Sequence, residues 1–242
     1  MPRGFWDWGV NPTGLLTPPE IATPELAARL GSIDTHERQG EVIFLDSFEH
    51  GLNKWNTITA GAGAAVNLIA SAARSGGYAA DLVAGSDATR LAGIGHLQSY
   101  LAQGRFGVEF SALLLQPGQL LTLAVIVYTG TQIQGYRIRY DPQANLLQYL
   151  NSSAVWVTLA SSVYLYPATT LWHTVKLVVD ARTAKFTRLI VGSTIYDLST
   201  IDASVAADTT QPNLDVSIVQ TGRPGFNDII EIDDFILTQN EP

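Results

Sequence analysis

Four carboxylates have the type and spacing to do chemistry in this chain. Asp46 and Glu49 lie in one stretch, and Asp233 and Asp234 lie in another near the C-terminus. Hard oxygen ligands of this kind suit calcium if the two stretches meet in the fold. The alternative, which we favour, is that these side chains cap turns and pair with arginines. We therefore predict no metal ion and no cofactor.

Sequence motifs for catalysis are missing. The chain has no cysteine, which excludes a thiolate nucleophile and thiolate ligands for zinc. It also lacks a Walker loop, a His-Glu-x-x-His pair and a Gly-x-Ser-x-Gly elbow. We predict that the protein is not an enzyme. A glycoside hydrolase or lyase with an unrecognised carboxylate pair is kept as an alternative.

Composition and charge limit the partners further. Of the 242 residues, 46% are hydrophobic and 15% are charged, so the chain can build one large core. A net charge of −8 gives no electrostatic footprint for a nucleic acid or an anionic membrane. No run approaches the roughly 18 apolar residues of a membrane span, and no secretion signal opens the chain. We expect a soluble protein that binds neither nucleic acid nor membrane.

Alternating residues indicate β-strands over most of the chain. In residues 134–140, Tyr136 and Tyr140 share one face while Arg137 and Arg139 occupy the other, which is typical of a half-buried antiparallel strand. Short strands with turns between them favour an all-β, antiparallel jelly-roll β-sandwich over residues 41–242. The clearest predicted strands are residues 106–115, 120–128, 146–150, 154–159, 174–180, 185–191, 214–219 and 229–237.

Residues 1–40 form a different region, which we predict to be an extended, proline-rich N-terminal arm. Residues 23–31 carry a capping threonine, a proline at the first helical position and a terminal glycine, so they predict one short helix. Aromatic residues in such an arm are costly to leave in water. The arm therefore either folds back on its own sandwich or, as we favour, docks on a partner. The predicted docking residues are Phe5, Trp6, Trp8, Leu15, Leu16, Leu26 and Leu30.

Three segments resemble concanavalin A-like and laminin G-like jelly-roll domains. Residues 46–55 read Asp-x-Phe-Glu-x-Gly-x-x-x-Trp, residues 232–235 read Ile-Asp-Asp-Phe, and residues 172–175 read Trp-His-x-Val. Laminarinase-like glycosidases of this fold carry a Glu-x-Asp-x-x-Glu strand. The matching run here starts at Glu231 but ends in Ile236, so it lacks the proton donor that the resemblance would imply.

The order of arm, linker and jelly roll also resembles domains of bacteriophage virion proteins, including capsid decoration and tail-associated proteins. Arginine outnumbers lysine 11 to 3, and the planar guanidinium suits fixed hydrogen bonds at subunit contacts. Our leading hypothesis is a homo-oligomeric capsid decoration protein at the virion surface. Its partners would be the major capsid protein or other virion subunits, bound through the arm.

A lectin-like carbohydrate-binding module for host or glycan attachment is the alternative function. Such a sandwich needs aromatic faces on a concave sheet or loop, and Trp55, Trp156, Trp172 and nine tyrosines are available. Trp156 and Trp172 abut apolar strands, which favours the core for most of these rings. We also expect the ring of His173, at the start of a strand, to donate to a loop carbonyl.

Deleting residues 1–40 tests the decoration hypothesis. The truncated chain should lose its oligomeric state and its binding to particles, because the arm's apolar residues would carry those contacts. Light scattering and co-sedimentation with particles measure both properties. If truncation changed neither, the arm would have no docking role.

Overall fold

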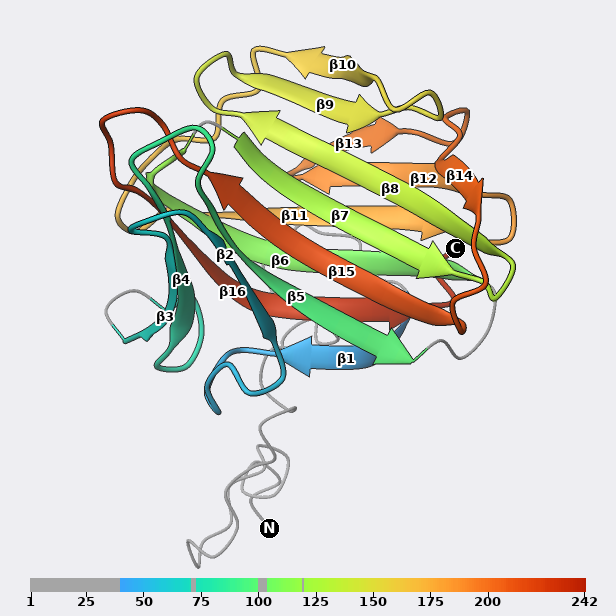
Figure 1. The fold of residues 1–242 in the computed structure, drawn as a ribbon, viewed down its shortest axis with the longest axis horizontal. Coiled ribbons are helices and arrows are strands. Elements are labelled where there is room, and N and C mark those ends of the chain that lie inside the picture. Colours follow the sequence, from blue (N-terminus) through green and yellow to red (C-terminus); the bar gives the residue numbers. More distant parts are fainter. Residues whose placement is uncertain (1–39, 71–72, 100–103, 119) are drawn as a thin grey trace, which may run out of the picture. The chain divides into compact units, whose positions relative to one another are not determined.

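The computed structural model describes residues 40–70, 73–99, 104–118 and 120–242 as a sandwich of two antiparallel β-sheets (Figure 1). The predicted all-β sandwich is confirmed over these residues, which contain no helix. No helix that could cross a membrane occurs among them either. The arm, its helix at residues 23–31 and the seven predicted docking residues lie outside the described residues, so the division at residue 40 stays a prediction.

Sheet A, behind in Figure 1, has β16 near its middle. The strands pair in the order β13-β12-β11-β6-β16-β4-β3, and β1 pairs with the second half of β16. Their bounds are β1 Glu41–Asp46, β3 Ala65–Ile69, β4 Ala79–Gly85, β6 Arg105–Gln116, β11 Trp172–Asp180, β12 Lys185–Val191, β13 Thr194–Asp197 and β16 Asp228–Gln239.

Sheet B lies in front in Figure 1 and has the order β10-β9-β8-β7-β15-β5-β2, with β14 paired to the start of β8. Its central strands come from distant parts of the chain. Its strands are β2 Asn56–Ala60, β5 Leu91–Ser99, β7 Leu120–Tyr128, β8 Gln132–Asp141, β9 Leu146–Leu150, β10 Trp156–Ser161, β14 Ser204–Ala207 and β15 Asn213–Thr221.

Alternation explains how the two sheets share one core. On β8, Tyr136 and Tyr140 are buried in the core while Arg137 and Arg139 are only partly covered, as the period of two predicts. The same alternation places Leu123 of β7 against the core. On β8 one side therefore packs inward and the other is only partly covered, whereas β4, β6 and β16 of sheet A are buried on both sides.

The prediction that Trp156 and Trp172 lie in the core is wrong. Both are partly exposed and neither belongs to the core cluster, whereas Trp55 is buried in it. Val155 and Leu171, the apolar residues that precede the two tryptophans, are themselves exposed, so an apolar neighbour does not fix the side that a ring takes. The prediction for His173 is confirmed, since its Nε2 lies 2.9 Å from the carbonyl oxygen of Tyr166.

An aromatic corner closes the sandwich where β1 leads into β2. The Asp46 carboxylate accepts a 2.7 Å hydrogen bond from Trp55 Nε1 and a 3.2 Å bond from Lys54 Nζ. The Trp55 ring stacks on Phe48 and packs edge-on against Phe235 of β16, with ring centroids 5.4 and 4.8 Å away. The Asp-x-Phe-Glu-x-Gly-x-x-x-Trp pattern thus links the first and last strands of the domain.

Substituting Trp55→Phe should destabilise the domain by about 1–3 kcal/mol, because the buried Asp46 carboxylate loses its shortest donor. Urea denaturation followed by circular dichroism measures the loss. Trp172→Phe is the control, since its partly exposed indole makes no hydrogen bond to the described residues. Equal losses in the two variants would show that ring volume, not the hydrogen bond, matters.

Candidate functional site

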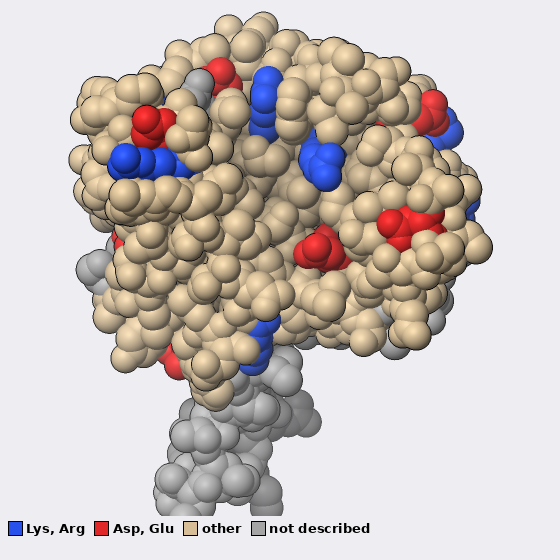
Figure 2. Space-filling view, in the orientation of Figure 1, with Lys and Arg blue, Asp and Glu red and all other residues tan. Residues whose placement is uncertain are grey.

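The outer face of sheet B is broad, poor in charge and hollowed across its middle (Figure 2). Here this hollow is called the trough. Its strands are β8, β7, β15 and β5, which lie side by side in the sheet. Because the inward residues of these strands fill the core, the trough is built from the alternate, outward residues.

Small residues make the floor of the trough. Across the sheet, Ala124 of β7 lies opposite Ser217 of β15, and Ser217 lies opposite Gly95 of β5. Gly93 lies two residues before Gly95 on β5, where a Cβ would come within 2.5 Å of the Ile218 carbonyl oxygen and 2.8 Å of Val219 Cγ2, so Val219 already covers this position. Register thus brings small residues from three distant segments into one area and leaves a space above the sheet.

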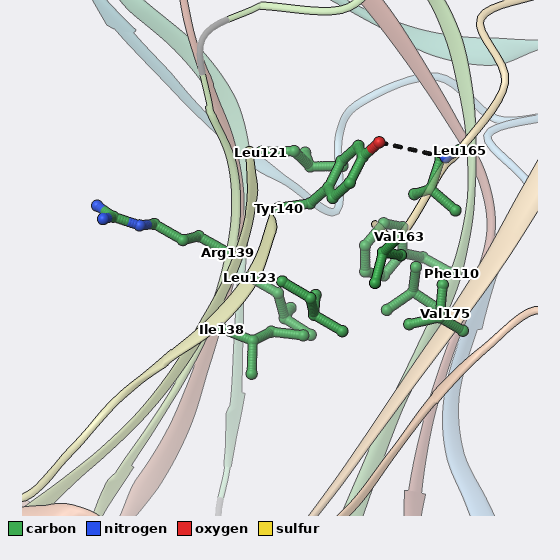
Figure 3. Close-up of a pocket in the computed structure, with 11 residues that line it drawn as sticks. Phe110, Leu121, Leu123, Ile138, Arg139, Tyr140, Val163, Leu165 and Val175 are labelled. Atoms are coloured by element: carbon green, nitrogen blue, oxygen red, sulfur yellow. Dashed lines mark hydrogen bonds between the residues drawn. The ribbon is translucent and has the colours of Figure 1, made fainter. Parts of the chain in front are cut away.

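Two arginines of β8 form one wall of the trough. Arg137 pairs across the sheet with Ala124, and Arg139 pairs with Thr122. Figure 3 shows the Arg139 side chain pointing away from the space between the sheets, while Ile138 and Tyr140 point into it. The alternation read from the sequence therefore placed these two guanidinium groups on the correct side, although it assigned them no role.

Arg139 is held in place by its neighbours. Its Nε donates a 2.7 Å hydrogen bond to Gln148 Oε1 on β9, and its guanidinium stacks 4.2 Å above the Trp156 ring on β10. Burial lowers the pKa of Arg139, and the nearby Asp141 carboxylate opposes that shift. Trp156 therefore carries an arginine on one face and does not offer that face as a bare sugar platform.

Arg137 has no such support. No hydrogen bond or ion pair joins its guanidinium to any other residue that the structure describes. The side chain lies next to small or uncharged residues, Ala124 across the sheet and Gly135 two positions along the strand. Its five N–H donors are therefore available to a ligand.

Carboxylates on this face are widely separated. Asp141 lies at the end of β8, where its Oδ1 accepts the backbone N–H groups of Gln143 and Ala144. Asp215 of β15 is level with Gly135, six residues along β8 from Asp141. At about 3.4 Å per residue the two carboxylates are about 20 Å apart along the strands. That separation is too large for the carboxylate pair of a glycosidase.

The condition set for the four calcium candidates is met, because β1 pairs with β16 and Asp46 lies opposite Phe235, so the two stretches are neighbours. Their oxygens, however, are used within the protein. Glu49 Oε1 accepts from the Gly77 and Tyr78 N–H groups, Asp233 Oδ2 from the Arg74 and Ser75 N–H groups, and Asp234 pairs with Arg74 Nη1 at 3.3 Å.

These contacts match the favoured interpretation, in which the carboxylates cap turns and pair with arginine. Over the described ranges, no group of three or more histidine, aspartate or glutamate side chains is arranged to hold a metal ion. The carboxylates of Glu49 and Asp233 accept hydrogen bonds from backbone N–H groups of residues 74–78. These bonds connect this segment to the turn after β1 and to β16.

Comparisons with known proteins show the fold. No protein-family model matches the chain, and no curated protein matches its sequence. Many solved structures are similar, and three of them, at 12–14% sequence identity, are covered nearly completely by this chain. Identity this low shows the fold alone, so the resemblance to concanavalin A-like jelly rolls is confirmed as a statement about fold.

The first of these structures is a carbohydrate esterase from Shiga toxin-encoding bacteriophage phi24B, with a TM-score of 0.57, 14% identity and coverage of 84% of this chain and 100% of the other. The endo-β-1,4-glucuronan lyase of the fungus Trichoderma reesei has a TM-score of 0.52 and 12% identity, with coverage of 82% of this chain and 96% of the other. Peanut lectin has a TM-score of 0.50 and 13% identity, with coverage of 81% of this chain and 96% of the other. The fold therefore occurs in both enzymes and lectins, and the absence of catalysis in this chain stays a prediction.

Stability should fall as the pH rises from 5 to 8. Burial, together with the neighbouring Asp81, raises the pKa of Glu231 to about 7, and burial raises that of Asp233 to about 7. The unfolded chain releases these protons near pH 4, so between pH 4 and 7 the native state binds more protons and loses stability with rising pH.

The Glu231→Gln variant should lose less unfolding free energy between pH 5 and 8 than the wild type, because the substitution removes one of the two groups that titrate. The slope of the unfolding free energy against pH should therefore be smaller. The pKa shift corresponds to about 2–3 kcal/mol between pH 5 and 8, measurable by urea denaturation at both values. Asp202→Asn, at an exposed carboxylate paired with Lys185, is the matched control and should keep the wild-type slope. An unchanged slope in Glu231→Gln would contradict the assignment.

Proposed function

We propose that the described domain is a non-catalytic carbohydrate-binding domain that holds an acidic oligosaccharide in the trough of sheet B. The observation that carries this proposal is Arg137, a guanidinium on the trough wall with no protein partner among the described residues. A guanidinium presents two parallel N–H donors that match a carboxylate. A sugar acid placed over the small-residue floor would complete that pair.

The rest of the trough supports an oligosaccharide rather than an isolated anion. The Ala124, Ser217 and Gly95 floor leaves room for sugar rings over several strands. Gln148 and Thr158 extend the polar wall beyond Arg139, with Gln148 Nε2 3.5 Å from the Thr158 hydroxyl. Amide and hydroxyl groups of this kind bond to sugar hydroxyls, so binding can extend along the sheet.

The structural neighbours are consistent with a carbohydrate ligand. By name, one is a carbohydrate esterase, one acts on glucuronan and one is a lectin. They support the alternative function from the sequence more than capsid decoration. The wide separation of Asp141 and Asp215 favours binding over hydrolysis as the role of the trough.

The hypothesis of capsid decoration rests on the arm and stays a prediction. The same holds for the virion-surface location, the homo-oligomer and the capsid-protein partners. They do not conflict with glycan binding, because the arm and the trough are different parts of the chain. Truncation of residues 1–40 tests them separately from the trough.

Arg137→Ala tests the trough. The variant should bind uronic-acid oligosaccharides at least about tenfold more weakly in isothermal titration calorimetry, a loss of about 1.4 kcal/mol. The fold should be unaffected, because Arg137 makes no hydrogen bond or ion pair with the described residues. Ser217→Tyr should abolish binding by filling the floor.

Two variants control for charge and bulk. Arg182→Ala removes an exposed guanidinium paired with Asp180 in sheet A, and Ile195→Tyr enlarges an exposed side chain of β13. Both should bind like the wild type. If Arg137→Ala and Arg182→Ala weakened binding equally, net charge rather than the trough would explain the affinity.

A further inference from the structure

A second pocket, with a volume of about 350 Å³, opens at one end of the sandwich. Four segments surround it: the β6–β7 connection, the turn after β8, the stretch between β10 and β11, and the loop between β15 and β16. We refer to it as the end pocket. Its residues come from the ends of β6 and β8 and from the loops and turns beside them, and the outward residues that form the floor of the trough do not line it.

The floor of the end pocket is closed. Tyr140 reaches between the sheets, where its hydroxyl accepts a 3.2 Å hydrogen bond from the Leu165 N–H (Figure 3) and lies 3.4 Å from Asn145 Oδ1. Beneath this bond the apolar space between the sheets has a volume of only about 20 Å³. A ligand in the end pocket therefore rests on Tyr140 and Leu165 and cannot enter the core.

The walls contain three prolines and exposed aromatic rings. Pro117, Pro142 and Pro167 line the pocket from three different segments, and proline fixes the backbone φ angle. Tyr164 is 60% exposed and packs edge-on against Tyr166, with ring centroids 5.2 Å apart. The contact between His173 and the Tyr166 carbonyl ties this segment to β11. Little has to be ordered when a ligand binds.

The polar groups of the pocket are neutral as a set. Arg223 lines it, but its Nη2 and Nε lie 2.6 and 3.0 Å from Oδ1 of the fully buried Asp228, which neutralises the guanidinium. The amide side chains of Gln116 and Gln143 also line the pocket, and neither bonds to another described residue. Each amide can donate and accept, as the hydroxyls of a neutral sugar require.

We propose that the end pocket is a second carbohydrate site, which binds a neutral monosaccharide or the neutral end of an oligosaccharide. The volume lies at the lower end of the range for small-ligand sites. An exposed tyrosine ring suits the apolar face of a sugar, and two free amides suit its hydroxyls. The site goes beyond the trough, because it is neutral, closed at its floor and made by other residues.

Saturation-transfer NMR with the full chain and the methyl glycosides of glucose, galactose, mannose and N-acetylglucosamine tests the proposal. At least one glycoside should bind, and Tyr164→Ala should weaken its binding about tenfold or more. Gln143→Ala, in an exposed turn, should also weaken it. The matched control is Tyr78→Ala, at a tyrosine that is 40% exposed and does not line the pocket; it should bind normally.

Measuring each variant with the ligand of the other site distinguishes the two sites. Arg137→Ala should keep the binding of the neutral glycoside, and Tyr164→Ala should keep the binding of uronic-acid oligosaccharides. The end-pocket proposal is overturned if none of the four glycosides binds, or if binding survives unchanged in both Tyr164→Ala and Gln143→Ala. Neither result would affect the trough, which is measured with a different ligand.

Discussion

The pairing of β16 is the constraint on which the rest of the structure depends. This strand pairs with β6 along most of its length, with β4 along its first half and with β1 along its second half. The change of partner occurs at a bulge, where Asp234 adopts a left-handed φ of 48°. Asp233 stabilises the bulge, because its carboxylate accepts the N–H groups of Arg74, Ser75 and Asp234. Asp233, whose ionisation is expected to lower the stability as the pH rises, is thus the same residue that lets the last strand pair with the first.

A second buried group of charges, formed by Glu241, Lys176 and Arg188, lies on sheet A. Glu241 is fully buried and pairs with Lys176 at 2.8 Å and with Arg188 at 2.9 Å. Taking such charges out of water is costly, so this buried group is not by itself evidence of added stability. Here the group joins the C-terminal residues to β11 and β12. Sheet A therefore holds the C-terminal residues of the domain, and the outward residues of sheet B take no part in this group.

Much of the fold could be predicted from local pattern, whereas the site could not. The alternation on β8 predicted which side Tyr136 and Arg137 take, because a period of two is a local property. β4 and β5 were missed, because their alanine and glycine residues have low strand propensity and pair only in the tertiary context. The trough floor combines residues 95, 124 and 217, and only the register of β5, β15 and β7 brings them together. The end pocket combines four loops, and no spacing rule predicts which loops meet.

The two arginines of the trough wall differ in how much a ligand must order them. Arg139 is already fixed by Gln148 and Trp156, so a ligand that meets it loses little conformational entropy. Arg137 has no such contact, so binding to it must offset the cost of fixing a long side chain. Only a strong partner such as a carboxylate recovers that cost, since charge-assisted hydrogen bonds are about twice as strong as neutral ones. If the trough binds sugars as proposed, Arg139 would position the ligand and Arg137 would select an acidic one.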